Sequence, residues 1–147
     1  MTYSRPNSFA VVDCQNLSSN AFKTVLEIDT LGSYNTLKAT IPHLKKSKGS
    51  ILFVSATLHY RGTVMQSHVS AAKAAVDALS QVVAVEYGPF GVRSNVISPG
   101  GIAETEGVDR LIQRNHIDQT TRAMPLGRLG TAEEIADCTG LTSLKPD

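Results

Sequence analysis

Two short apolar runs, separated by one long amphipathic stretch, most constrain how this chain can fold. The first run, GSILFVSA, opens at Gly49 and is rich in β-branched and aromatic residues, which predicts a strand buried on both faces. Apolar residues at helical spacing then predict a helix from about Ser70 to Tyr87. The second run, VRSNVISPGG, predicts another strand that stops at Pro99. A strand, a helix and a strand in this order form a βαβ unit, so the sequence predicts an α/β fold with a parallel sheet.

Two further helices are expected to flank this unit. The stretch NAFKTVLEIDTLGSYNTLKATIPHLKKS begins at Asn20, which suits an N-cap, and Pro42 is expected to bend or end that helix. In TAEEIADC, Thr131 and Glu134 have the spacing of a capping box and predict a helix start. Asp29 falls on the same face as apolar residues of the first helix, which is unusual for a carboxylate.

Composition excludes several classes of function. The formal net charge of the 147 residues is +1, so no strong field favours nucleic acid. No apolar run approaches the roughly 20 residues of a membrane span. Cys14 and Cys138 lie far apart without metal-ligand spacing, which is typical of reduced thiols in an intracellular protein. His59, His68 and His116 share no such spacing either; we interpret them as surface or loop residues and predict no metal site.

Ligands in open α/β sheets bind beyond the carboxyl ends of the strands. Lys73 is predicted in the first turns of the helix after the first strand, so its ammonium can reach that crevice, although a solvated helix lysine is the simpler interpretation. The sequence Pro99-Gly100-Gly101 leaves backbone N–H groups open to a ligand, or forms a simple turn. Asp29 is either a buried hydrogen-bonding group or a group that handles a proton.

Three stretches of the sequence carry a family resemblance: GSILFVSATL, SAAKAAVDALSQVVAVEYGPFGVRSNVISPGGIAET and PLGRLGTAEEIAD. In this order and spacing they resemble the second half of the short-chain dehydrogenase/reductase superfamily. Within it, LSSNAFKTVLEIDTLGSYNT, SATLHYRG and GGIAETEGVDRL are most similar to peroxisomal 2,4-dienoyl-CoA reductases. The resemblance implies a Rossmann-like doubly wound parallel sheet with flanking helices, of which only the second half is expected here. Residues 1–147 would form a single partial domain, with residues 1–16 poorly matched and residues 138–147 a divergent tail.

The activity implied by the resemblance is NADPH-dependent reduction of a 2,4-dienoyl-CoA to a trans-3-enoyl-CoA, in the β-oxidation of unsaturated fatty acids. Most members of the superfamily carry Tyr-x-x-x-Lys, in which the tyrosine protonates a carbonyl. Here Lys73 is kept and Val69 stands at the tyrosine position, while Asp29 matches a central-helix asparagine. Reduction of a conjugated carbon–carbon bond does not need that tyrosine, so the implied catalytic residues are Lys73 and Asp29. Tyr60 is an alternative acid, with a spacing from Lys73 that does not suit a helix neighbour.

The resemblance also implies two binding regions. NADP(H) would be held by Lys73 and by the loop Pro99, Gly100, Gly101, Ile102, Ala103, Glu104 and Thr105. The acyl-CoA substrate would contact Ser18, Ser19, Asn20 and Arg110, with Arg110 suited to CoA phosphates. The glycine-rich turn that receives the pyrophosphate would belong to the first half of the fold, and we expect the chain to lack it.

Two other hypotheses remain open from the sequence. In one, the chain belongs to another acyl-thioester reductase, such as a trans-2-enoyl reductase. In the other, it is a non-catalytic fragment that associates with full-length subunits. A homo-oligomer is expected through the helices matching residues 20–47 and 70–88. The resemblance implies a peroxisomal location, although the last three residues, Lys145-Pro146-Asp147, are not a Ser-Lys-Leu signal; otherwise the location would be cytoplasmic.

Overall fold

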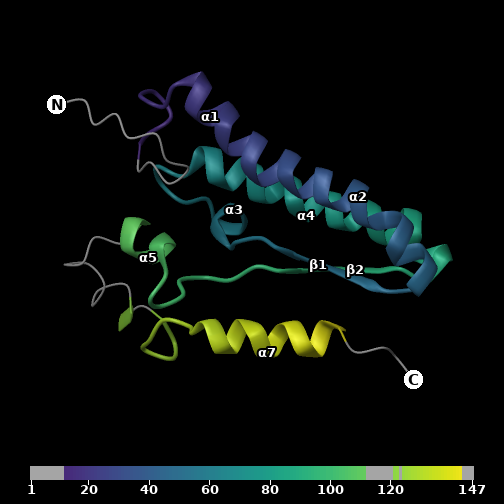
Figure 1. Ribbon diagram of the computed structural model, residues 1–147. Coiled ribbons are helices and arrows are strands. Elements are labelled where there is room, and N and C mark those ends of the chain that lie inside the picture. Colours follow the sequence, from purple (N-terminus) through teal and green to yellow (C-terminus); the bar gives the residue numbers. More distant parts are fainter. Residues whose placement is uncertain (1–11, 112–120, 123, 144–147) are drawn as a thin grey trace.

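Two parallel strands form the centre of the molecule (Figure 1). In the computed structural model, which describes residues 12–111, 121–122 and 124–143, β1 (Ser50–Val54) pairs with β2 (Arg93–Ile97). Ser50 lies opposite Arg93 and Val54 lies opposite Ile97. The chain connects the strands through the long helix α4 (Ser67–Tyr87), so the predicted βαβ unit is confirmed.

Helices cover both faces of the strand pair. Figure 1 shows α2 (Gly32–Ser47) and α4 on one side of the strands and α7 (Ala132–Ser143) on the other. The remaining elements are α1 (Ser19–Val25), the π-helical segment η1 (Leu26–Leu31), α3 (Leu58–Arg61), the 3-10 turn η2 (Gly88–Phe90) and α5 (Glu106–Leu111). None of the helices in the described part of the chain is long and apolar enough to cross a membrane.

The core lies between the strands and the helix pair α2 and α4. One buried cluster joins Leu37 of α2, Phe53 of β1, and Val76 and Val83 of α4. Val76 and Val83 are seven residues apart on α4, so both point to the same side, toward the strands. Removing each such side chain from water contributes roughly 1.5–3 kcal/mol to folding.

The predicted burial of the first strand on both faces is wrong. Successive residues of a strand point to opposite faces, and in β1 Phe53 is buried whereas Val54 is 57% exposed. The face that carries Phe53 packs against two helices. On the opposite side, α7 is the one helix that lies against the strands in the described part of the chain (Figure 1).

The helix boundaries differ from the sequence predictions at three places. The N-cap of α1 is Ser18, not Asn20, because its hydroxyl accepts a hydrogen bond from the Ala21 N–H at 3.1 Å. Of the two expectations for Pro42, an end of the helix is wrong, because α2 continues to Ser47. Packing of Leu37 and Ile41 into the core explains this, since tertiary contacts override local propensity. Finally, α4 begins three residues earlier than predicted.

The predicted capping box of α7 is confirmed. The Glu134 N–H donates to Thr131 Oγ1 at 3.2 Å, and the Thr131 N–H donates back to Glu134 Oε2 at 2.9 Å. Arg128 adds two hydrogen bonds to the same carboxylate, at 3.0 and 2.7 Å. Hydrogen bonds from Arg128 and from the Thr131 backbone lower the pKa of Glu134 to about 2.

Candidate active site

Lys73 lies where the carboxyl end of β1 meets the first two turns of α4. Its Nζ donates a hydrogen bond to the Val54 carbonyl at 3.3 Å and lies 3.7 Å from Asp29 Oδ2. The two side chains are only 20% and 28% exposed. The structure therefore places the Lys73 ammonium at the carboxyl end of β1, with Asp29 as its ion-pair partner.

A local irregularity of the first helix brings Asp29 to this position. Between α1 and α2, residues Leu26–Leu31 wind as a π-helix, which contains one residue more per turn than an α-helix. As a result, two consecutive residues contact α4: Asp29 pairs with Lys73, and Thr30 Oγ1 donates to the Ala72 carbonyl at 3.3 Å. Short π-helical segments often occur at functional sites.

Val69 fills the position one helical turn before Lys73. It is buried together with Val25 and Ala72, and Leu26 and Leu58 pack against this cluster. Position 69, where most members of the superfamily have a tyrosine hydroxyl, is therefore part of a buried apolar contact between α1 and α4. A proton donor for a carbonyl oxygen is absent from this position.

Backbone hydrogen bonds hold the loop that follows β2 from two sides. On the strand side, the Ser55 N–H donates to Ile97 O at 2.8 Å, and the Thr57 N–H donates to Pro99 O at 3.1 Å. On the other side, the Gly130 N–H donates to Gly101 O and the Ala103 N–H donates to Gly130 O. These bonds continue parallel strand pairing beyond the regular strands.

Two glycines of this contact lie close to the ends of neighbouring side chains. A Cβ on Gly101 would come within 2.8 Å of a Leu129 methyl group, and one on Gly130 would come equally close to Ile102. Gly100, in contrast, faces open space. The next residues turn the chain into α5, with Glu104 at a positive φ of 58° and Thr105 Oγ1 accepting from the Val108 N–H.

The predicted acyl-CoA residues lie at the same end of the molecule. Ser18, Ser19 and Asn20 are exposed at the start of α1. Arg110 belongs to α5, and its side chain lies outside the described residues. Figure 1 shows α1, α3 and α5 together near the carboxyl ends of the strands, where the βαβ argument expects a ligand.

Sequence reasoning missed a polar network next to Lys73. Tyr60 Oη donates to Asp77 Oδ2 at 2.6 Å, His59 Nε2 lies 2.9 Å from the same oxygen, and Tyr60 Oη lies 3.3 Å from Ser98 Oγ. Burial raises the pKa of Asp77, but hydrogen bonds from Ser55, Tyr60 and His59 outweigh it, so the pKa lies below its usual value. The spacing of Asp77 from Lys73, one helical turn, was the available signal.

The interpretation of His59 and His68 as surface or loop residues is wrong. The His59 side chain is only 14% exposed because it packs toward α4 and bonds to Asp77. His68 is 1% exposed in the first turn of α4, and burial lowers its pKa, which favours the neutral ring. Nothing in the sequence around these histidines marks them as buried. His116 lies outside the described residues.

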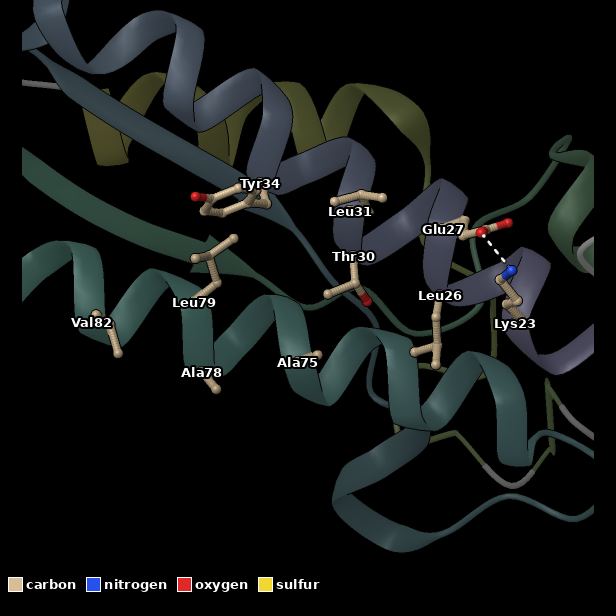
Figure 2. Close-up of a pocket in the computed structure, with 10 residues that line it drawn as sticks. All are labelled: Lys23, Leu26, Glu27, Thr30, Leu31, Tyr34, Ala75, Ala78, Leu79 and Val82. Carbon is tan, nitrogen blue, oxygen red and sulfur yellow. Dashed lines mark ion pairs between the residues drawn. The ribbon is translucent and has the colours of Figure 1, made fainter.

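An apolar groove runs along the outer side of the helix pair (Figure 2). It has a volume of about 600 Å³ and lies between η1 and α2 on one side and α4 on the other. Figure 2 shows Tyr34 opposite Leu79 across it, with the Lys23–Glu27 ion pair, 3.5 Å long, at one end. Half-exposed Leu31, Tyr34 and Val82 make this an unusually apolar surface.

Comparison with known proteins agrees with this fold. Residues 7–141 match a protein-family model described as enoyl-(acyl carrier protein) reductase. The chain is 56% identical over 129 residues to the peroxisomal 2,4-dienoyl-CoA reductase [(3E)-enoyl-CoA-producing] of Saccharomyces cerevisiae, covering 88% of this chain and 44% of that protein. It is 48% identical over 124 residues to the enzyme of the same name from Danio rerio, covering 82% and 41%. It thus spans less than half the length of these two relatives.

A solved structure confirms the expected fold class. A short-chain dehydrogenase from Bacillus anthracis superposes with a TM-score of 0.82 at 32% identity, covering 92% of this chain and 53% of that one. With its parallel strand pair and helices, the described part is an incomplete Rossmann-like fold. The chain belongs to the short-chain dehydrogenase/reductase family.

Proposed function

We propose that this chain provides the nicotinamide and substrate end of an NADPH-dependent 2,4-dienoyl-CoA reductase that forms a trans-3-enoyl-CoA. The observation that carries the proposal is the Lys73–Asp29 pair beside a buried valine at the usual tyrosine position. The two relatives named for this activity support it. Both are named as peroxisomal, and we propose the same location.

The proposed reaction does not need a phenolic acid at position 69. NADPH, when bound, would supply the hydride that adds to the distal end of the diene. Negative charge then spreads to the thioester oxygen, and a proton returns at the α-carbon. The positive charge of Lys73 stabilises the oxyanion by its field. Asp29, held 3.7 Å from that ammonium and partly exposed, organises the path by which the proton arrives.

The residues present fit a nicotinamide nucleotide. The Lys73 ammonium has three N–H donors, and among the described residues it contacts Val54 O and Asp29. One donor is therefore left for a ribose hydroxyl. The loop Pro99–Thr105 brings backbone groups to the same strand end, and the open space at Gly100 permits close approach of a ligand.

The acyl-CoA is proposed to bind at the exposed start of α1. Ser18, Ser19 and Asn20 present short polar side chains there, although the Ser18 hydroxyl also caps the helix. Arg110 on α5 suits the CoA phosphates, because a guanidinium binds phosphate through two parallel hydrogen bonds.

The apolar groove of Figure 2 supports self-association of the protein through its long helices. Leucine, valine, alanine and tyrosine side chains line much of the groove. Covering this apolar surface with the same helix pair of a second subunit removes it from water, which favours association. We propose a homo-oligomer in which this surface meets its counterpart on a second subunit.

The test uses the 56% identical yeast relative as a host. Residues of this chain replace the 129 matched residues of that enzyme, and NADPH oxidation is followed with 2,4-hexadienoyl-CoA and with trans-2-hexenoyl-CoA. We expect dienoyl-CoA reduction with a 3-enoyl product, and a loss of at least about 100-fold in kcat/KM for Lys73→Ala. Lys46→Ala, an exposed lysine on α2, is the matched control.

Two results of this assay would overturn the proposal. An unchanged kcat/KM for Lys73→Ala would remove the lysine from the mechanism. Reduction of trans-2-hexenoyl-CoA in preference to the dienoyl substrate would instead favour an enoyl reductase. The 147-residue chain is assayed in parallel, because activity of this polypeptide alone is a separate question from activity of its residues in the chimera.

A further inference from the structure

Asp77 and Tyr60 together join three segments that meet beside the candidate active site. It accepts from Tyr60 Oη at 2.6 Å and from His59 Nε2 at 2.9 Å, both on α3. Since a carboxylate only accepts, His59 Nε2 carries the proton in this contact. Tyr60 Oη also lies 3.3 Å from Ser98 Oγ at the end of β2. Through Asp77 and Tyr60, α4 is thus connected to α3 and to the residue that follows β2.

We call the hydrogen-bonded set of Asp77, His59, Tyr60 and Ser98 the anchor. Its burial and short distances distinguish it from a chance surface contact. The side chains of His59 and Asp77 are each 14% exposed, and the His59 and Tyr60 rings lie 4.1 Å apart. A hydrogen bond of 2.6 Å from a hydroxyl to a carboxylate belongs to the short, strong class. Most of the Tyr60 side chain is exposed, so the bond, and not burial of the ring, holds it in place.

Both ends of the anchor are next to residues of the proposed site. Asp77 follows Lys73 by one turn on α4. Ser98 immediately precedes the loop Pro99–Thr105, and the Thr57 N–H, just before α3, donates to Pro99 O. A movement of α3 would therefore shift the beginning of this loop relative to Lys73.

We propose that Asp77, acting through Tyr60 and His59, is a positioning residue that holds the start of the loop Pro99–Thr105 at a fixed place relative to Lys73. Asp77 touches neither substrate nor cofactor in this role. The expected effect on NADPH binding rests on the proposed function. The mechanical role of the anchor does not depend on that function.

The first test measures amide hydrogen exchange in the 147-residue chain. Tyr60→Phe removes the hydroxyl and keeps the ring. We expect the protection factor of the Thr57 amide to fall about tenfold, because a hydrogen bond to a charged group is lost. The Arg93 amide, bonded to Gly49 O at the other end of the strand pair, should keep its protection.

Ser80→Ala is the matched control for this measurement. Ser80 Oγ lies 2.8 Å from Ser94 Oγ, so this variant also removes a side-chain bond between α4 and β2, but near the opposite end of the strand. It should lower protection of the Arg93 amide and spare Thr57. Equal loss at both amides in either variant would show a general loosening and would overturn the anchor.

The second test asks whether the two residues act as one unit. Asp77→Asn removes the charge and should lower Thr57 protection several-fold, and the double variant should lower it no further than Tyr60→Phe alone. Additive losses would mean that the residues act separately and would overturn the proposal.

The third test reads the effect on the cofactor in the yeast chimera. Tyr60→Phe should raise KM for NADPH about three- to tenfold while kcat changes less than about twofold, since positioning of the loop acts on binding. An unchanged KM beside a faster Thr57 exchange would overturn the positioning role. A chimera inactive without any substitution would overturn the proposed function, and the exchange measurements would still decide on the anchor.

Discussion

Val69 makes the position before Lys73 apolar and closely packed. It is buried against Val25 and Ala72, so a tyrosine there would overfill the contact between α1 and α4. We expect Val69→Tyr to lower the free energy of unfolding by about 1–3 kcal/mol. It should not raise dienoyl-CoA turnover, because the proposed reaction delivers the proton to the α-carbon and not to a carbonyl oxygen.

Val85→Tyr is the control for this prediction, because Val85 is exposed on the same helix. Denaturant unfolding and turnover in the chimera are the two measurements. A Val69→Tyr variant with higher dienoyl-CoA turnover would mean that the missing phenol limits the reaction.

Glu134 gives the chain a pH-dependent contact. Hydrogen bonds from Arg128 and the Thr131 backbone hold its pKa at about 2. A lowered pKa stabilises the fold above the unfolded-state value of about 4.3, and this contribution is lost as the pH falls through about 2. An NMR titration of the side chain should give a midpoint near 2, and Arg128→Ala should move it toward the ordinary value. A midpoint near 4.5 in the unmodified chain would contradict the contact.

Histidine burial shows what single residues leave undetermined. His59 and His68 stand in unremarkable polar sequence, yet one bonds to Asp77 and the other is fully buried at the start of α4. Their partners come from residues distant along the chain or from the packing of a neighbouring helix. Spacing rules for metal or catalytic sites do not reach such contacts.

The first helix of the chain is divided by its π-helical segment η1. A periodicity of 3.6 residues assigns Asp29 to one face of an α-helix. The wider π turn rotates Asp29 and its neighbours to a different direction around the helix axis. Asp29 and Thr30 consequently both reach α4. The helix was predictable from its apolar spacing, whereas the π turn depends on contact with a second helix.

Helix α2 tolerates a proline in its interior. Pro42 cannot donate a hydrogen bond to the preceding turn, and an interior proline costs up to about 3 kcal/mol relative to alanine. We expect Pro42→Ala to raise the free energy of unfolding by about 1 kcal/mol or more, measured by denaturant unfolding. Lys38→Ala, at an exposed position one turn before, should change it by less than about 0.5 kcal/mol. A destabilised Pro42→Ala variant would show that the ring itself packs favourably.

The groove between the long helices predicts the behaviour of the assembled molecule. Val82 is half-exposed at its rim (Figure 2), and a carboxylate there would oppose removal of the groove from water. We expect Val82→Glu to reduce the molecular mass found by sedimentation velocity. Val64→Glu, at a highly exposed position off the groove, should leave the mass unchanged. Equal masses for all three proteins would rule out this surface as the interface.

Cofactor affinity is also a property of the whole molecule. Dinucleotide binding depends strongly on a glycine turn and helix N-terminus that receive the diphosphate, and the 147 residues contain no Gly-x-x-x-Gly-x-Gly pattern. We expect the 147-residue polypeptide to bind NADPH with a dissociation constant no better than about 1 mM by calorimetry. The chimera should bind more tightly. Micromolar binding by the polypeptide alone would contradict this account.

The sequence by itself determined the parts that depend on neighbouring residues. The βαβ unit follows from two apolar runs and a helical stripe, and the α7 cap follows from Thr131 and Glu134. The position of Lys73 near the strand end follows from its place in the first turns of α4. Each of these is set by periodicity or by hydrogen bonds over three or four residues, which a sequence displays directly.

Only the tertiary structure decided which side chains meet. The Lys73–Asp29 pair joins residues 44 positions apart through a π turn, and the Tyr60 hydroxyl meets both Asp77 and Ser98. Val54 is exposed because the helices cover the two faces of the strand pair unequally. These outcomes depend on the relative placement of packed elements, and local spacing carries no information about that placement.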